Sequence, residues 1–406
     1  MSLSEQLISL EDKYGAHNYH PLPVVLDRGE GVYVWDVDEK KYFDFLSAYS
    51  AVNQGHSHPR IIKALTDQAK KITLTSRAFY NSELGKYEEF VTKLFGYDKL
   101  LPMNSGAEAV ETALKLCRKW AYMKKGIPQN EAVILFATGN FHGRTLAIIS
   151  ASTEDSSRKD FGPYLPNIKI VEYGNLEAFK TEIANNKNIA GFIVEPIQGE
   201  AGIIIPEDEY LKSCSQICKE NQVLFIADEI QTGIARTGKM LACDHVSIKP
   251  DMLILGKALS GGVLPVSAVL ANDDIMLCIK PGEHGSTYGG NPLACAVATE
   301  ALKVVIDEKL ADNAEKMGQL FRAELSKVKS KWIKNIRGRG LLNALEINDT
   351  QESQTAWNIC IKMSENGLLA KPTHGNIIRF APPLVINEAQ VKEAVAIIEK
   401  SLASVD

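Results

Sequence analysis

The sequence lacks the features of a nucleic-acid-binding protein or a membrane protein. Its 406 residues carry 45 Lys and Arg against 50 Asp and Glu, a formal net charge of −5. No excess of positive charge is therefore present for phosphate backbones or anionic lipids. No apolar run reaches the roughly 20 residues that a bilayer span needs. We expect a protein that acts on small molecules, without nucleic-acid or membrane partners.

Cysteine pairing and metal-ligand patterns are also missing. The seven cysteines are scattered, and Cys214 and Cys218 have no second ligand pair nearby, which favours buried thiols over zinc. His56 and His58 have no carboxylate beside them in the loop, so we expect a structural role and no metal. The first twenty residues contain three acidic residues and no arginine, unlike secretory or transit peptides. The sequence predicts a cytoplasmic enzyme.

The usual nucleotide-binding motifs are absent as well. None of the three Gly-Lys pairs is followed by Ser or Thr, so no P-loop is present. The segment GRGLLN at 338–343 begins like a dinucleotide-binding loop but has no third glycine. A phosphate group on something other than a nucleotide is the better expectation.

Short apolar runs rich in β-branched residues alternate with segments of helical periodicity. This alternation is typical of an α/β fold. The expected buried strands are 132–137, 190–196, 222–229, 251–255 and 266–270. We expect a large domain over 55–292, and a smaller domain formed by residues 1–54 together with residues 293–406.

A predicted helix over 107–122 follows small polar residues and a glycine. Asn104 or Ser105 can cap this helix, and the free N–H groups around Gly106 and Ala107 can bind a phosphate. A plain helix cap without any ligand is the alternative.

Two oppositely charged residues end neighbouring predicted strands. Asp228 follows the run LFIA, and Lys257 follows the run MLILG before a glycine-rich turn. Ligands of open parallel sheets bind at these strand ends. Desolvation there favours the neutral amine that imine formation needs. The two residues could form a salt bridge or hold opposite ends of one heteroaromatic cofactor, and Asp228 could instead contact a helix start.

Six segments occur in the order and spacing of the pyridoxal-phosphate (PLP)-dependent class III (ω-) aminotransferases: NSGAEA, FHGRT, EPIQGEAG, ADEIQTG, LGKALSGG and HGSTYGGNP. The resemblance runs from about Tyr14 to the last helix. It implies a fold-type I transferase, in which a large domain has a mixed, mostly parallel sheet flanked by helices. A smaller α+β domain would come from both termini.

Four further segments resemble the branch of this family that acts on ornithine: GAHNYHPLPV, FLSAYSAVNQGH, LTSRAFYN and LAKPTHGNIIRFAPPL. The reaction implied is transfer of the δ-amino group of L-ornithine to 2-oxoglutarate, giving L-glutamate 5-semialdehyde and L-glutamate. Proline synthesis and ornithine breakdown could both use it. The alternatives are an N-acetylornithine or 4-aminobutyrate aminotransferase, or a PLP-binding protein without activity.

The resemblance assigns catalytic roles to two residues. Lys257 would bind the PLP aldehyde and then move the proton, and Asp228 would pair with the pyridinium nitrogen. Gln231 would donate to the phenolic oxygen. The other expected cofactor contacts are Ser105, Gly106 and Ala107 at the phosphate, Phe141 stacked on the ring, and His142 and Glu195 around it.

His142 departs from the ornithine branch, in which tryptophan follows the stacking phenylalanine. A histidine there can change cofactor packing or add a pH-dependent contact. Ser286 and Thr287 would reach the phosphate of a neighbouring subunit, so a homodimer or a higher homo-oligomer is expected.

The resemblance also assigns the substrate contacts. Arg144 would bind the distant carboxylate with its planar guanidinium, Tyr19 would contact the α-amino group, and Tyr49 would line the same end. Arg379 would bind the α-carboxylate of 2-oxoglutarate, whereas Glu200 would cover it when ornithine binds. A permanent Glu200–Arg379 bridge is the structural alternative.

Overall fold

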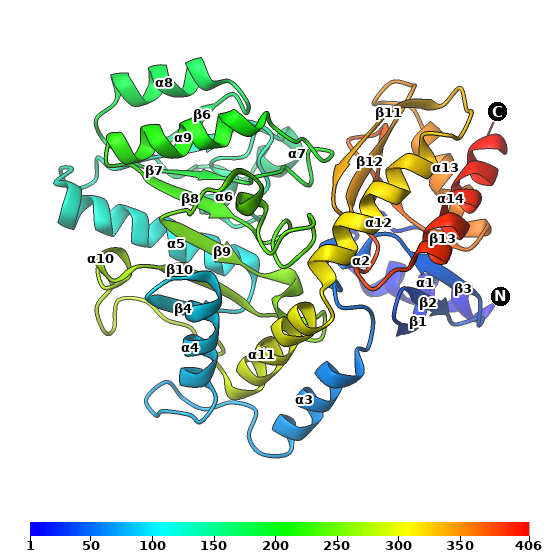
Figure 1. Ribbon diagram of the computed structural model, residues 1–406, viewed down its shortest axis with the longest axis horizontal. Helices are drawn as coiled ribbons and strands as arrows, with labels where there is room; N and C mark the ends of the chain where they lie inside the picture. The colour runs from blue at the N-terminus through cyan, green and yellow to red at the C-terminus, as the bar shows by residue number, and fades with distance from the viewer. Residues whose placement is uncertain (406) are drawn as a thin grey trace.

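A seven-stranded sheet forms the centre of the larger of two lobes, at the left of Figure 1. The computed structural model describes residues 1–405. The order across this sheet is β4 (Lys99–Met103), β10 (Ser267–Ala271), β9 (Met252–Leu255), β8 (Leu224–Asp228), β7 (Ile189–Val194), β5 (Val133–Ala137) and β6 (Ile168–Val171). The strands from β9 to β6 are parallel, whereas β10 is antiparallel to both of its neighbours.

The central strands are buried along their whole length because helices cover both faces of the sheet. Every residue of β5, β7, β8, β9 and β10 is buried. This explains why these strands read as continuous apolar runs rather than as alternating ones. The predicted α/β class and the mixed, mostly parallel sheet are confirmed, and the observed strands differ from the predicted ones by a few residues at the ends.

Two four-stranded sheets lie in the smaller lobe, which contains both chain ends (Figure 1). One joins the N-terminal strands to a C-terminal strand, in the order β1 (Leu26–Glu30), β2 (Tyr33–Asp36), β3 (Lys41–Asp44) and β13 (Leu368–Leu369). The other has the order β11 (Ile333–Arg339), β12 (Leu342–Ile347), β15 (Ile377–Phe380) and β14 (Lys371–Thr373). The domain boundaries at residues 54 and 292 stay predictions.

Fourteen α-helices surround these sheets within residues 1–405. They are α1 (Leu3–Tyr14), α2 (Ser47–Ser50), α3 (Pro59–Ala69), α4 (Leu84–Phe95), α5 (Gly106–Trp120), α6 (Leu146–Ile149), α7 (Asp155–Arg158), α8 (Leu176–Asn185), α9 (Asp208–Glu220), α10 (Asp273–Met276), α11 (Pro292–Asp307), α12 (Leu310–Leu325), α13 (Thr355–Glu365) and α14 (Glu388–Ala403). A π-helical turn (Ala121–Lys125) and two 3₁₀ turns (Ala242–Val246 and Lys257–Ser260) complete the set.

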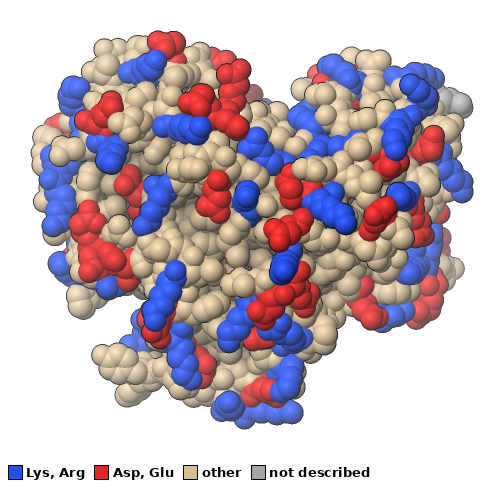
Figure 2. Space-filling model, in the orientation of Figure 1, with Lys and Arg blue, Asp and Glu red and all other residues tan. Residues whose placement is uncertain are grey.

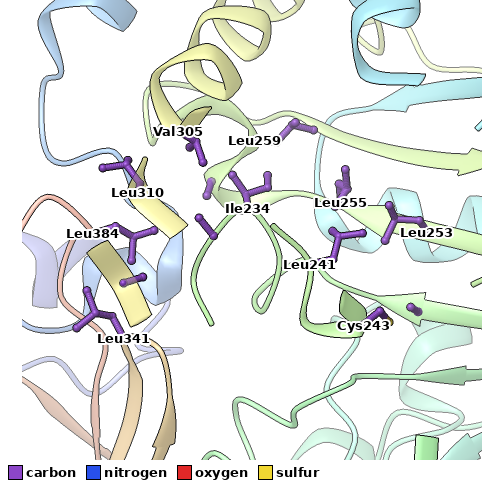
Figure 3. Close-up of a cluster of buried hydrophobic side chains, with 14 of the residues drawn as sticks. Ile234, Leu241, Cys243, Leu253, Leu255, Leu259, Val305, Leu310, Leu341 and Leu384 are labelled. Atoms are coloured by element: carbon purple, nitrogen blue, oxygen red, sulfur yellow. The ribbon is translucent and has the colours of Figure 1, made fainter. Parts of the chain in front are cut away.

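The two lobes share one apolar core. Figure 3 shows Ile234 and Leu259 from the larger lobe close to Val305, Leu310 and other residues from the C-terminal part of the chain. These side chains are at most 3% exposed and belong to one continuous cluster. Because this joint is apolar and buried, it fixes how the smaller lobe sits on the larger one.

The surface carries both signs of charge. On the face shown in Figure 2, basic and acidic residues are interspersed over both lobes. None of the helices within residues 1–405 is long and apolar enough to cross a membrane. All seven cysteines are free and buried, including Cys214 and Cys218 on α9.

The expectation that the histidines of loop 55–59 lack carboxylate partners was wrong. His56 Nε2 lies 2.7 Å from Asp44 Oδ2, and His58 Nε2 lies 3.0 Å from Glu308 Oε1. Both carboxylates come from segments distant in the sequence, which is why local reading missed them. Each histidine has its own carboxylate, so the pairs tie this loop to β3 and to the end of α11.

Candidate active site

A cavity of about 210 Å³ lies at the carboxyl ends of the parallel strands. Its lining combines a lysine, three carboxylates, a histidine and the start of a helix. The lining residues are Gly106, Ala107, Phe141, His142, Gly143, Glu195, Glu200, Asp228, Ile230, Gln231, Thr232 and Lys257. Eight of these were expected from the sequence as cofactor contacts, and Glu200 was expected as a substrate contact.

Lys257 lies two residues beyond the end of β9, at the first position of a 3₁₀ turn. Its backbone has a φ of 44°, a left-handed conformation that is rare for a residue with a side chain. Burial lowers the pKa of its amine, although the nearby Glu200 and Asp228 carboxylates act against this. The position therefore favours the neutral, nucleophilic amine.

Asp228, the last residue of β8, pairs with His142 rather than with Lys257. His142 Nδ1 lies 2.6 Å from Asp228 Oδ2, and the two side chains are 0% and 4% exposed. The N–H of Ile230 donates to the other carboxylate oxygen at 3.0 Å. Burial by itself lowers the pKa of His142, but the Asp228 carboxylate outweighs it and raises the pKa overall. The pair therefore holds the Asp228 carboxylate in a fixed orientation at the cavity wall.

The neighbouring acid, Glu229, faces away from the cavity. It accepts the N–H groups of Ala242 and Cys243 at 3.0 and 2.8 Å. Because successive side chains at a strand end point to opposite sides, only Asp228 of this acidic pair reaches the cavity.

Helix α5 begins at the cavity with its first residues, Gly106 and Ala107. Ser105 is the N-cap residue: its Oγ accepts the Glu108 N–H at 3.2 Å, and Glu108 Oε2 accepts the Ser105 N–H at 2.8 Å. The first intrahelical bond starts only at Ala109 N. The N–H groups of Gly106 and Ala107 thus precede the helical ladder and can bind an anion with the help of the helix dipole.

Glu195 is a buried carboxyl group that holds the backbone beside the cavity. Its two oxygens accept the N–H groups of Phe141 at 3.0 Å and Gly199 at 3.4 Å. Burial raises the pKa of Glu195 to about 7. Since it fixes the backbone of Phe141, it orders the aromatic wall of the cavity.

The structure brings Glu200 and Arg379 together. Arg379 Nη1 donates to Glu200 Oε1 at 2.6 Å, and the same oxygen accepts Gln231 Nε2 at 3.0 Å. Burial raises the pKa of Glu200, but the Arg379 guanidinium more than offsets this and the pKa is lowered overall. Glu200 is therefore ionised and covers Arg379 on the cavity side.

The other substrate-contact candidates lie outside this cavity. The Arg379 guanidinium packs over the Tyr49 ring, with its carbon 4.9 Å from the centroid. Burial raises the pKa of Tyr49, and Tyr19 is near enough to contribute to that shift. Tyr19 is 73% exposed. Arg144 is exposed, lies over the Phe141 ring at 5.6 Å, and donates to Ser157 Oγ at 3.3 Å.

Ser286 and Thr287 line a separate groove together with residues 74–78. Ser286 Oγ accepts the side-chain amide of Asn104 at 2.8 Å. This contact places the loop beside the start of α5, while the two hydroxyl-bearing residues lie outside the cavity of their own chain.

Three cavity residues had no assigned role: Gly143, Ile230 and Thr232. A Cβ atom at Gly143, whose φ is 129°, would meet the Ala107 Cβ at 3.0 Å. A Cβ atom at Gly106 would meet Ile230 Cδ1 at 3.0 Å. At both positions the missing side chain allows close packing at the start of α5. The glycine of the FHGRT segment was the one sequence signal that could have pointed to Gly143.

The donor set of the cavity fits PLP. Lys257 would hold the aldehyde, Asp228 the ring nitrogen, and the start of α5 the phosphate, with Phe141 and Ile230 as apolar walls. The two glycines allow Ile230 and residue 143 to pack closely against the start of α5. Gln231, which was expected to donate to the phenolic oxygen, donates its side-chain amide to Glu200 Oε1 at 3.0 Å in this structure.

The family model "Aminotransferase class-III" matches residues 14–402. A relative from Drosophila ananassae, "Ornithine aminotransferase, mitochondrial", is 61% identical and covers 99% of this chain and 92% of its own. The solved ornithine aminotransferase of Toxoplasma gondii, described with partial occupancy of PLP, has a TM-score of 0.97 at 47% identity and covers 99% of this chain and 94% of its own. An acetylornithine aminotransferase from Elizabethkingia anophelis has a TM-score of 0.92 at 59% identity and covers 99% and 100%.

Proposed function

The chain belongs to the class-III aminotransferase family, and from this premise we propose that it is an ornithine aminotransferase. It transfers the δ-amino group of L-ornithine to 2-oxoglutarate and yields L-glutamate 5-semialdehyde and L-glutamate. The relatives with this name and the Toxoplasma structure support the assignment at 47–61% identity over nearly the whole chain. Its cofactor is PLP.

PLP, when bound, supplies the carbonyl group that accepts the amino group and the ring that withdraws electrons from the reacting carbon. Lys257 provides the buried primary amine for attachment and is the base that moves a proton at the substrate carbon. Asp228, ordered by His142, holds a positive charge on the ring nitrogen. The start of α5 holds the phosphate, and Glu195 orients the Phe141 wall.

The Glu200–Arg379 pair carries the choice of the δ-amino group. An uncovered Arg379 would bind the α-carboxylate of ornithine and present its α-amino group to the cofactor. With Glu200 on Arg379 at 2.6 Å, this binding mode is blocked. The α-carboxylate of 2-oxoglutarate can displace Glu200, while Arg144 binds its distant carboxylate. Tyr19 contacts the α-amino group of ornithine, with Tyr49 beside it.

The active unit is a homodimer in which Ser286 and Thr287 reach the partner's phosphate site. The location of both residues in a groove outside their own chain's cavity supports this arrangement. Phe79, Tyr80 and Tyr288, next in sequence to the groove residues, are 73%, 104% and 58% exposed, which a second copy would relieve. Light scattering after gel filtration tests the dimer, and a monomer with full activity would refute it.

N-acetylornithine is the second candidate donor, because the Elizabethkingia enzyme of that name is 59% identical. Its acetylated nitrogen has no ammonium group for Tyr19 to contact. A preference for this substrate would keep the fold, the cofactor and Lys257, and would change only the outer contacts.

The deciding experiment is a single half-reaction of the PLP-loaded protein without 2-oxoglutarate. L-ornithine, N-acetylornithine, 4-aminobutyrate and L-glutamate are added separately, and the cofactor absorbance and the cyclised semialdehyde are followed. We expect the ratio of half-reaction rate to donor concentration to be highest for L-ornithine. A higher value with N-acetylornithine would overturn the substrate assignment.

We propose a cytoplasmic location for the protein. The Drosophila relative is named mitochondrial, so the location needs its own test. Fractionation of cells that express the full chain without a tag decides it, and recovery in the mitochondrial fraction would refute the cytoplasmic location.

A further inference from the structure

The segment that carries Tyr19 has little packing of its own. Residues 11–21, which form the last turn of α1 and the segment after it, are all exposed. A loosely held segment must be ordered when a substrate binds, and this ordering costs affinity. The position of Tyr19 therefore depends on the few contacts that fix the segment beforehand.

His20, the next residue after Tyr19, is held from two sides by the C-terminal part of the chain. Its ring stacks on Trp357 of α13, with centroids 4.6 Å apart and an interplanar angle of 23°. Its carbonyl oxygen accepts a hydrogen bond from Lys371 Nζ at 2.9 Å. Within residues 1–405, this is the only hydrogen bond between residues 16–21 and the C-terminal part.

Lys371 belongs to a short hairpin formed by β14 and β15, and this hairpin also contacts or contains Glu200 and Arg379, the residues proposed to select the carboxylate. Lys371 of β14 lies opposite Arg379 of β15 in the sheet register. Two residues after Lys371, Thr373 Oγ1 donates to the Glu200 carbonyl oxygen at 2.7 Å. One hairpin thus carries Arg379, fixes the backbone of Glu200 and holds the segment of Tyr19.

We propose that Trp357 and Lys371 are positioning residues that set the place of Tyr19 through His20, and thereby the preference for donors that carry an α-amino group apart from the amino group that reacts. The inference rests on the proposed function, because Tyr19 is the proposed contact of that group. Neither residue lines the cavity, so both act on the donor only through the segment they hold. An anchored Tyr19 makes its contact without a further loss of chain entropy.

Trp357→Ala removes the stack, and Lys371→Met removes the hydrogen bond while keeping the aliphatic stem. Lys362→Met is the matched control, since Lys362 lies on the helix of Trp357 and pairs only with Glu365 on the surface, at 2.9 Å. The rate of limited chymotryptic cleavage after Tyr19, in this exposed segment, reports the anchoring directly. We expect faster cleavage in the first two variants and none of this change in the control.

The half-reaction of each PLP-loaded variant then reports the effect on donors. We expect the ornithine concentration at half-maximal rate to rise about five- to tenfold, with the maximal rate nearly unchanged. The values for 4-aminobutyrate and L-glutamate should stay the same, because these donors do not use the Tyr19 contact. Equal losses for all three donors, unchanged cleavage in both variants, or normal ornithine kinetics despite faster cleavage would overturn the proposal.

Tyr19→Phe separates this inference from the proposed function. If it impairs ornithine selectively while Trp357→Ala and Lys371→Met do not, the anchoring proposal fails and the function stands. If Tyr19→Phe leaves ornithine unaffected, the Tyr19 role and the anchoring proposal both fail, whereas measured conversion of ornithine would still support the aminotransferase. Ornithine inert in the unaltered protein would refute the function itself.

Discussion

The inner and outer ends of this active site are built from different kinds of structure. At the inner end, Asp228 ends β8 and is buried, and Lys257 lies just beyond the neighbouring parallel strand β9 and is partly buried, with other charged groups around both. At the outer end, Tyr19 and Arg144 lie on exposed segments with few partners. The inner groups are fixed by strand pairing and by the apolar core, so their electrostatics are set before any ligand arrives. The outer groups depend on local anchors, and such positions allow the substrate to change while the chemistry stays the same.

Loss of the inner lysine should have the largest effect. In Lys257→Ala we expect turnover to fall by about 10³-fold or more, because no other primary amine lines the cavity to attach the cofactor or move the proton. The rate with ornithine and the absorbance of the bound cofactor measure it. Lys257→Arg, which keeps a positive charge but not a nucleophilic amine, should be equally inactive. Appreciable turnover in either variant would contradict the role of Lys257.

The buried carboxylate should come next. Asp228→Asn keeps the shape but removes the negative charge at the ring nitrogen, so we expect kcat to fall by about 10²- to 10³-fold. Asp251→Asn is the matched control. Asp251 accepts the Phe225 N–H at 2.8 Å near the other end of the same two strands, far from the cavity. If both variants lost activity equally, Asp228 would have only a structural role.

A substitution of Glu195 tests the inner end of the active site by its effect on the free energy of unfolding rather than on the reaction rate. Burial raises its pKa from an ordinary 4.5 to about 7, so between these values the folded protein binds a proton that the unfolded chain does not. Its contribution to the free energy of unfolding is therefore lost as the pH rises from about 4.5 to 7, by at most about 3 kcal/mol. Glu195→Gln, which mimics the protonated acid, should not show this loss.

Thermal unfolding of the two proteins at pH 5 and pH 8 measures the difference. The melting temperature of Glu195→Gln minus that of the unaltered protein should be larger at pH 8 than at pH 5. Glu399→Gln, at an exposed position of α14, should track the unaltered protein at both pH values. A constant gap for Glu195→Gln would show that its carboxyl group does not titrate in this range.

The difference between the two ends also explains what the sequence could predict. Strand ends can be read from apolar runs, so the neighbourhood of Lys257 and Asp228 followed from local pattern and the α/β rule. Which of the two acids, Asp228 or Glu229, reaches the cavity depends on which side of the strand end faces it, and local pattern does not give this. The pairing of His142 with Asp228 joins residues 86 positions apart, and no local signal carries it.

Contacts between segments that are separated in the sequence could not be predicted from the sequence. His20 meets Trp357 across almost the whole chain, and His56 finds Asp44 only because β3 folds back beside its loop. The resemblance to a family supplied the Glu200 and Arg379 roles, but not the hairpin that holds both. Such contacts follow from tertiary packing, which depends on the complete fold rather than on any short segment.

The smallest effect is expected for Glu200, which tests how the inner and outer ends of the active site are connected. Glu200 joins them, since it lines the cavity and pairs with Arg379 at 2.6 Å. In Glu200→Ala, Arg379 is free to bind α-carboxylates, so the half-reaction with L-glutamate should become about tenfold more efficient relative to that with ornithine. Glu300→Ala removes a partly buried carboxylate that is paired with Arg60 at 2.7 Å outside the cavity, and it should leave the ratio unchanged. If the ratio in Glu200→Ala also stays unchanged while the protein loses stability, the pair is a permanent structural bridge. In that case the selection of the δ-amino group would fall to Tyr19 and its anchor alone.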